Sequence, residues 1–214
     1  MGRIRAVFFD LDGTLVRYRG VDFESSWGAI GVAAGLEREW RELQRRYLPH
    51  PELYDRWLQE NARLLAGRAV DPILRKLLPP PYPPGAREAI AALRARGLTL
   101  GILSSGVNLV ADYVAADLGL DMALANVLVV RNGVFTGEAV LRVPLWRKAE
   151  VLLEELGKLG LSPGEVAFVG DNVNDIPVFR AVGLGIAYAP KDPAVAEAAH
   201  RVTEDFSRIP EFIP

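Results

Sequence analysis

Two short acidic clusters hold the side chains whose types and spacing could do chemistry. Asp10 and Asp12 flank a single leucine, and Asp171 and Asp175 lie within the run Gly170-Asp171-Asn172-Val173-Asn174-Asp175. Together they would repel, since two like charges about 4 Å apart cost roughly 4 kcal/mol at an effective dielectric of about 20. A hard cation bound by carboxylates, a carbonyl oxygen and waters would offset this repulsion, and Mg²⁺ favours these ligands. Alone, the Asp10 and Asp12 pair is more often part of a turn or a helix cap, and the second cluster is also typical of a loop that caps the following helix.

Two neighbouring carboxylates can hold two catalytic roles. One can attack a phosphoryl group to form an acyl phosphate, while its neighbour protonates the leaving oxygen and later activates water. Other residues suit phosphate oxygens: the hydroxyl of Ser104, the backbone amides of Ser105 and Gly106 at an expected helix start, and the charge of Lys148. These residues indicate transfer of the phosphoryl group of a small phosphorylated metabolite.

The catalytic candidates follow predicted strands. The apolar run Ile4 to Phe9 predicts a buried strand that ends at Asp10. From residue 86 on, helices and strands alternate, with helices predicted at Ala86 to Ala95, Asn108 to Leu118, Lys148 to Leu159 and Asp175 to Val182, and strands at Leu98 to Leu103, Val166 to Val169 and Leu184 to Ala187. This alternation predicts an α/β fold, with a Rossmann-like, mainly parallel sheet flanked by helices. Ligands of such sheets bind at the carboxyl ends of the strands, where Asp10, Ser104 and Asp171 are expected.

The segment between Val16 and Leu78 has a different pattern. Charged and aromatic residues recur at helical spacing from Glu37 to Tyr47 and from Leu53 to Leu65. The proline-rich run that follows, residues 79–85, is compatible with neither a helix nor a central strand. We therefore predict a helical cap at residues 16–81, inserted after the first strand of a core formed by residues 1–15 and 82–214. Val127 to Val130 and Val134 to Thr136 predict a separate hairpin with an Asn-Gly turn.

The composition narrows the functional class. The 214 residues have a net charge of −2 and no basic run, so nucleic acid is not an expected partner. There is no cysteine, which excludes a cysteine nucleophile and thiolate metal sites. The apolar runs are strand-sized and no signal sequence is evident, so we expect a cytoplasmic protein without a membrane partner. A monomer and a homodimer both remain open.

The motifs, taken in order, resemble the haloacid dehalogenase superfamily of phosphotransferases. The resemblance rests on Asp10-Leu11-Asp12-Gly13-Thr14, Ser104, Lys148 and Gly170 through Asp175. It implies that Asp10 is the nucleophile and Asp12 the general acid and base. It also implies Mg²⁺ held by Asp10, the Asp12 carbonyl and Asp171 with support from Asp175, phosphate bound by Ser104 and Lys148, and an acidic loop oriented by Asn174.

Three stretches resemble the phosphoserine phosphatase branch of that superfamily: Ser104 to Gly106, Ala125 to Gly137 and Gly170 to Phe179. A helical cap of the C1 type, directly after the first motif, agrees with this branch. Haloalkanoate dehalogenases of the superfamily lack the second aspartate, so Asp12 argues against their chemistry. Phosphoserine is the best single substrate prediction. The alternatives are another small organic or sugar phosphate, a phosphomutase, and a non-catalytic binding protein.

The cap departs from the phosphoserine phosphatase pattern. In that branch a glutamate shortly after the first motif holds the substrate amine, whereas this chain has Arg19, with Glu24 the nearest acid. The arginine that would bind the substrate carboxylate has no match, because Glu60 lies near its place, flanked by Arg56 and Arg63. These five residues are our candidates for substrate specificity. With Arg19 beside the catalytic turn, we expect at best a modest preference for phosphoserine and useful activity on anionic or sugar-like phosphates.

Overall fold

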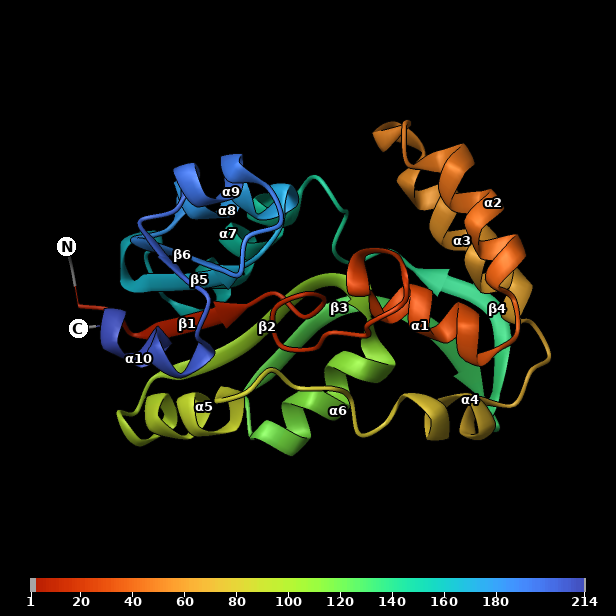
Figure 1. Cartoon of the computed structure of the whole chain (residues 1–214), viewed down its shortest axis with the longest axis horizontal. Helices are drawn as coiled ribbons and strands as arrows, with labels where there is room; N and C mark the ends of the chain where they lie inside the picture. Colours follow the sequence, from red (N-terminus) through yellow and green to blue (C-terminus); the bar gives the residue numbers. More distant parts are fainter. Residues whose placement is uncertain (1–2, 214) are drawn as a thin grey trace.

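A seven-stranded sheet with the order β4-β3-β2-β1-β5-β6-β7 forms the centre of the computed structural model, which describes residues 3–213 (Figure 1). The strands are β1 (Ala6–Phe9), β2 (Thr99–Val107), β3 (Met122–Arg131), β4 (Val134–Val140), β5 (Val166–Gly170), β6 (Leu184–Tyr188) and β7 (Arg201–Thr203). Within the described residues, β4 alone pairs in the antiparallel sense. The predicted mainly parallel α/β fold is confirmed.

Helices cover both faces of this sheet (Figure 1). One face carries α5 (Ala86–Ala95), α6 (Asn108–Leu118) and α10 (Ile209–Phe212), and the other carries α7 (Lys148–Leu159), α8 (Ile176–Ala181) and α9 (Pro193–Ala198). Because both faces are covered, β1, β5 and β6 are buried throughout and consist almost entirely of apolar residues and glycine. The predicted bounds of α5, α6 and α7 are confirmed.

The register of the central strands brings their carboxyl ends together. Phe9 of β1 pairs with Ile102 on one side and with Val169 on the other. The chain segments that leave β1, β2 and β5 therefore emerge at the same edge of the sheet. One prediction there is wrong: Ser105 and Gly106 do not open a helix, because β2 continues to Val107, which pairs with Asn126 of β3.

The segment after β1 forms the helices α1 (Ser26–Ala33), α2 (Glu37–Tyr47), α3 (Tyr54–Leu65) and α4 (Val70–Leu77). They gather at the β3–β4 end of the molecule (Figure 1). Backbone hydrogen bonds join the α3–α4 connection and the start of α4 to the β3–β4 hairpin, from the Gly67 amide to the Phe135 carbonyl and from the Val70 amide to the Gly133 carbonyl, both at 2.9 Å. The hairpin predicted as a separate unit is thus packed against the helices of the inserted segment.

A continuous buried cluster includes residues of the inserted segment, such as Trp40 and Leu65, and residues of the sheet, such as Phe9 and Ile102. The division into a core of residues 1–15 and 82–214 and a cap of residues 16–81 therefore stays a proposal about chain organisation. Across residues 3–213, the helices are all too short or too polar to cross a membrane.

Candidate active site

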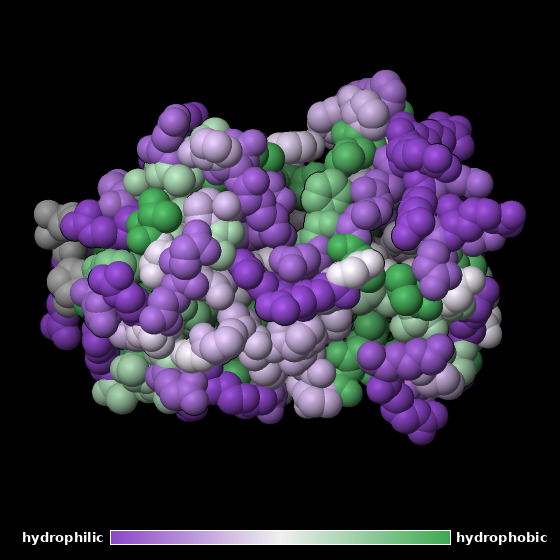
Figure 2. All heavy atoms as spheres, in the orientation of Figure 1, coloured by the Kyte–Doolittle hydropathy of each residue, from purple (hydrophilic) through white to green (hydrophobic). Residues whose placement is uncertain are grey.

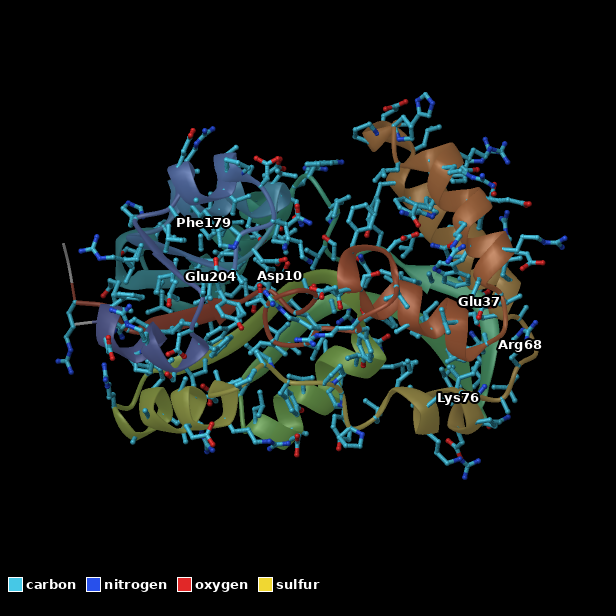
Figure 3. All side chains as sticks on the ribbon, viewed as in Figure 1. Asp10, Glu37, Arg68, Lys76, Phe179 and Glu204 are labelled. Carbon is cyan, nitrogen blue, oxygen red and sulfur yellow. The ribbon has the colours of Figure 1, made fainter. Side chains whose placement is uncertain are left out.

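The two acidic clusters meet at the carboxyl edge of the sheet. Asp10 follows β1, and its amide donates to the Val169 carbonyl of β5 at 2.8 Å. Asp171 follows β5, and Asp175 precedes α8. One carboxylate oxygen from each of Asp10, Asp171 and Asp175 lies within 4.8 Å of the other two, and all three residues are buried. Figure 3 shows Asp10 near the middle of the molecule, where β1 ends.

The second acidic loop is held by its own carboxylate. Oδ2 of Asp175 accepts from the Asp171 amide at 3.0 Å and from the Asn172 amide at 3.2 Å. This turn passes so close to Gly170 that a Cβ there would lie 2.3 Å from Asp175 Oδ2, so only glycine fits. Asn174 is buried in the same turn. The loop thus directs two carboxylates toward Asp10 from a rigid backbone.

A buried lysine links these acids. Lys148, the first residue of α7, places Nζ 3.0 Å from Asp10 Oδ2 and 2.6 Å from Asp175 Oδ1, and it is 1% exposed. Burial by itself lowers the pKa of Lys148, but the charges of Asp10 and Asp175 outweigh it and leave this pKa above its ordinary value. The two carboxylates therefore favour the charged form of Lys148 beside Asp10.

Lys191 is a second cation at this edge, and our sequence analysis did not find it. Its Nζ lies 2.9 Å from Asp171 Oδ2 and donates to the Phe23 carbonyl at 3.2 Å. Burial raises the pKa of Asp171, and Lys191 partly opposes this shift. Its place in the sequence could have indicated this role, because Lys191 comes shortly after β6 and Asp171 directly after β5, the neighbouring strand.

Asp12 lies in a different environment from Asp10. Its Oδ1 accepts from the Ser26 amide at 2.7 Å, and its Oδ2 accepts from the Ser26 hydroxyl at 2.8 Å. Burial and the charge of Asp10 raise the pKa of Asp12 to about 7, although Ser26 acts in the opposite direction. Near neutral pH this carboxyl group exchanges readily between its protonated and ionised forms, as an acid–base catalyst requires. Ser26, the first residue of α1, had no signal in the local sequence.

The phosphate-binding candidates lie at the end of β2. Ser104 is buried and its Oγ accepts from the Gly106 amide at 3.1 Å, whereas Ser105 Oγ is buried without a hydrogen-bond partner among residues 3–213. The Ser105 carbonyl accepts from Trp27 Nε1 at 3.0 Å, the Tyr54 hydroxyl at 3.1 Å and Asn126 Nδ2 at 2.9 Å. The cap helices α1 and α3 therefore hold the predicted phosphate-binding strand directly.

A cavity of about 410 Å³ opens between these residues and the cap. Its catalytic side includes Asp10, Asp12, Ser104, Ser105, Gly106 and Asn174. Its cap side is mainly apolar, with the aromatic residues Phe23, Trp27, Trp40, Tyr54 and Trp57. Figure 2 shows hydrophobic side chains in a hollow between the region of α7–α9 and that of α2 and α3.

The five residues predicted to set substrate specificity do not line this cavity: Arg19, Glu24, Arg56, Glu60 and Arg63. Arg19 and Arg63 are exposed. Glu60 accepts from the Tyr47 hydroxyl at 2.7 Å and from Arg56 Nε at 3.3 Å, so these two candidates bind each other. Glu24 lies 3.6 Å from Lys191 Nζ and 3.9 Å from Arg17 Nε. The assignment of substrate specificity to these five side chains therefore stays a prediction, which the lining of this cavity does not support.

Buried carboxylates, a lysine between them and a strand end with two serine side chains, all at the carboxyl edge of a parallel sheet, are the groups that an enzyme of phosphoryl transfer needs. The family model described as haloacid dehalogenase-like hydrolase matches residues 4–183. The chain belongs to this family.

The relatives specify the branch. A phosphoserine phosphatase of Albidiferax ferrireducens is 33% identical over 208 residues, which cover 92% of this chain and 83% of the relative. One from Methanocaldococcus jannaschii is 29% identical over 196 residues, with 91% and 90% covered. A solved phosphoserine phosphatase with an analogue of the phospho-aspartyl intermediate superposes with a TM-score of 0.80 at 27% identity, covering all of both chains. The protein is a phosphatase, and within its family it is similar to the phosphoserine phosphatases.

Proposed function

We propose that the protein is a Mg²⁺-dependent phosphomonoester hydrolase that acts on a small phosphorylated metabolite through an aspartyl phosphate on Asp10. The observation that carries this proposal is the position of the Asp10 carboxylate. It lines the cavity and lies 3.0 Å from the Lys148 ammonium, and the pKa of Asp12, two residues away, is raised to about 7.

The acidic residues fit a divalent cation. The three carboxylates of Asp10, Asp171 and Asp175 exceed the two ammonium groups that contact them, those of Lys148 and Lys191, so the ionised cluster keeps an excess of negative charge. Asp10, Asp171 and the Asp12 carbonyl would hold Mg²⁺, with Asp175 in support. When bound, Mg²⁺ would polarise the phosphoryl group and offset its negative charge.

The protein's own residues divide the remaining work. An oxygen of Asp10 attacks phosphorus, and the bond from phosphorus to the alcohol oxygen breaks. Protonated Asp12 gives its proton to that oxygen, so that the alcohol leaves neutral. Ionised Asp12 then takes a proton from water, which attacks the acyl phosphate and releases inorganic phosphate. Ser104 and Lys148 position the phosphoryl oxygens throughout.

The test of this function is Asp10→Asn. We expect phosphate release from small phosphomonoesters to fall by more than about 1,000-fold, because the amide cannot form the phosphoenzyme. Acid-quenched wild type incubated with labelled substrate should contain label on Asp10, and the variant should contain none. Asp55→Asn on the exposed surface of α3 is the matched control and should keep full activity. Substantial turnover by Asp10→Asn, freed of wild-type protein, would refute the assignment of Asp10 as nucleophile.

A further inference from the structure

We propose that the substrate carries, beyond its phosphate, an uncharged organic group with a ring-sized apolar surface and a hydrogen-bonding amide or hydroxyl, in place of the ammonium and carboxylate of phosphoserine. This inference rests on the proposed function, because it places the phosphate at Asp10. It concerns the cap side of the same cavity.

The first observation is the aromatic wall. The rings of Trp27 and Trp40 have centroids 6.5 Å apart, and those of Tyr54 and Trp57 are 6.1 Å apart in an edge-to-face arrangement. The Trp27 indole N–H and the Tyr54 hydroxyl are both engaged by the Ser105 carbonyl. These two residues therefore offer the cavity their carbon surfaces, which favour burial of an apolar group.

The second observation is the distribution of charge. A zwitterionic substrate needs a cation for its carboxylate and an acid for its ammonium, both shielded from water. Apart from Asp10 and Asp12, the charged residues that line the cavity within residues 3–213 are Asp22, Glu37 and Arg41, and all three are exposed. Figure 3 shows Glu37 at the start of α2, well away from Asp10. Exposed charges discriminate weakly between ligands because water screens them.

The third observation is a pair of unsatisfied polar atoms. Trp57 and Asn61 lie one turn apart on α3 and both line the cavity. Trp57 Nε1 and Asn61 Oδ1 are buried, have no hydrogen-bond partner among residues 3–213, and Asn61 is only 4% exposed. Buried polar atoms are nearly always paired, so this donor and this acceptor are two hydrogen-bonding positions that a polar group of a ligand would satisfy. Both side chains are uncharged, which again favours an amide or a hydroxyl over an ion.

The size of the cavity agrees with this assignment. Its volume of about 410 Å³ falls within the range of sites for drug-sized ligands, about 300 to 1,000 Å³. The three-carbon amino acid part of phosphoserine would leave much of the aromatic wall without contact.

The test compares phosphates of primary alcohols at saturating Mg²⁺: propyl phosphate, 3-phenylpropyl phosphate, 3-benzamidopropyl phosphate and phosphoserine. The first three have similar leaving groups, so differences in kcat/KM among them report the organic part. We expect kcat/KM for 3-phenylpropyl phosphate to exceed the values for propyl phosphate and phosphoserine by about tenfold or more. The value for 3-benzamidopropyl phosphate should be higher still. A tenfold lead for phosphoserine, or equal values for the propyl and phenylpropyl compounds, would overturn the inference.

Binding to the Asp10→Asn variant, followed by tryptophan fluorescence, separates this inference from the proposed function. Tighter binding of the phenylpropyl compound than of propyl phosphate, without hydrolysis of any compound by wild type, would support the cavity assignment and refute the hydrolase. Hydrolysis by wild type without tighter binding of the phenylpropyl compound would support the hydrolase and refute the cavity assignment.

Trp57→Phe examines the unsatisfied donor while it keeps an aromatic ring. We expect the ratio of kcat/KM for 3-benzamidopropyl phosphate to that for 3-phenylpropyl phosphate to fall by about tenfold. Tyr47→Phe is the matched control, because it also removes one polar atom from a cap aromatic, but its hydroxyl binds Glu60 outside the cavity. It should leave the ratio unchanged. An unchanged ratio in Trp57→Phe would contradict the role of its N–H.

Discussion

Asp10 and Asp12 are two residues apart, yet their surroundings differ sharply. Asp10 accepts from the Leu11 amide at 2.7 Å and lies 3.0 Å from the ammonium of Lys148. Asp12 faces Ser26, and its pKa rises to about 7 through burial and the charge of Asp10. Different environments let neighbouring carboxylates serve as nucleophile and as acid. The chemistry of this protein is therefore decided at the level of single side-chain contacts.

Asp12→Asn should reveal the acid role through the leaving group. The amide cannot protonate the departing oxygen, so we expect a severe loss of phosphoenzyme formation from alkyl phosphates, about 100-fold or more. An activated aryl phosphate needs little protonation and should lose much less in the same step. Rapid-quench measurement of that step for both substrates makes the comparison, and equal losses would remove Asp12 from the acid role.

Ser26→Ala should shift the pH dependence of turnover. The Ser26 hydroxyl donates to ionised Asp12 and so lowers its pKa. Without the hydroxyl this pKa rises above about 7, and Asp12 stays protonated to higher pH. The alkaline limb of kcat/KM for an alkyl phosphate should therefore move upward, by about one pH unit for roughly 1.4 kcal/mol of lost hydrogen bonding. Ser26→Thr should restore the wild-type profile, whereas an unmoved limb in Ser26→Ala would exclude this coupling.

At the scale of elements, the β3–β4 hairpin supports the cap. Gln59 of α3 donates through Nε2 to the Ala139 carbonyl at 2.8 Å and accepts from the Ala139 amide at 3.3 Å. The Gln59 side chain thereby satisfies the backbone N–H and C=O groups of Ala139 in β4, as a neighbouring strand would. Because α3 also carries Tyr54 and Trp57, this contact positions the cavity wall.

Gln59→Ala should loosen this attachment. Loss of the amide leaves the Ala139 backbone groups without their partner, which we expect to lower the free energy of unfolding by about 1 to 3 kcal/mol in denaturant titrations. Hydrogen exchange at the Ala139 amide should also accelerate, because its acceptor is gone. Arg63→Ala, exposed one turn further along the same helix, is the control and should change neither quantity measurably. Unaltered exchange at Ala139 would mean that Gln59 does not hold the hairpin.

At the scale of the whole molecule, the buried acidic centre should couple metal binding to stability. Burial raises the pKa values of Asp171 and Asp175, so the folded protein disfavours their charged forms unless a cation is present. A cation that binds only the folded state stabilises it, by about 2.7 kcal/mol at a concentration 100 times Kd.

We expect Mg²⁺ to raise the Tm of metal-stripped wild type by about 5 to 10 °C under that condition. NaCl at matched ionic strength should have a smaller effect, because it only screens the charges. In Asp171→Asn the Mg²⁺-dependent increment should largely disappear, and differential scanning calorimetry measures it. Equal increments in wild type and variant would place the bound ion elsewhere, and full activity after rigorous metal removal would reject the metal requirement itself.

The sequence alone was sufficient for the mainly parallel sheet and the family. Both depend on local patterns: a buried apolar strand before Asp10, another before Asp171, and helical periods between them. Such patterns can be recognised in the sequence itself, because a strand buried on both faces requires apolar residues, whereas polar residues are tolerated where the strand ends. The order of the motifs then specified the haloacid dehalogenase family, which the matching family model confirms.

Only the tertiary structure decided what surrounds these residues. Lys191 contacts Asp171 from a loop 20 positions away, Ser26 reaches Asp12 from a cap helix, and Asn126 spans from β3 to the Ser105 carbonyl. Counting along the cap selected Arg19 and Glu60, whereas Trp57 and Asn61 line the cavity, because chain distance does not determine which face of a cap helix turns toward it. That orientation is set by non-local packing of α1 and α3 against β2 and the hairpin, which no local pattern encodes.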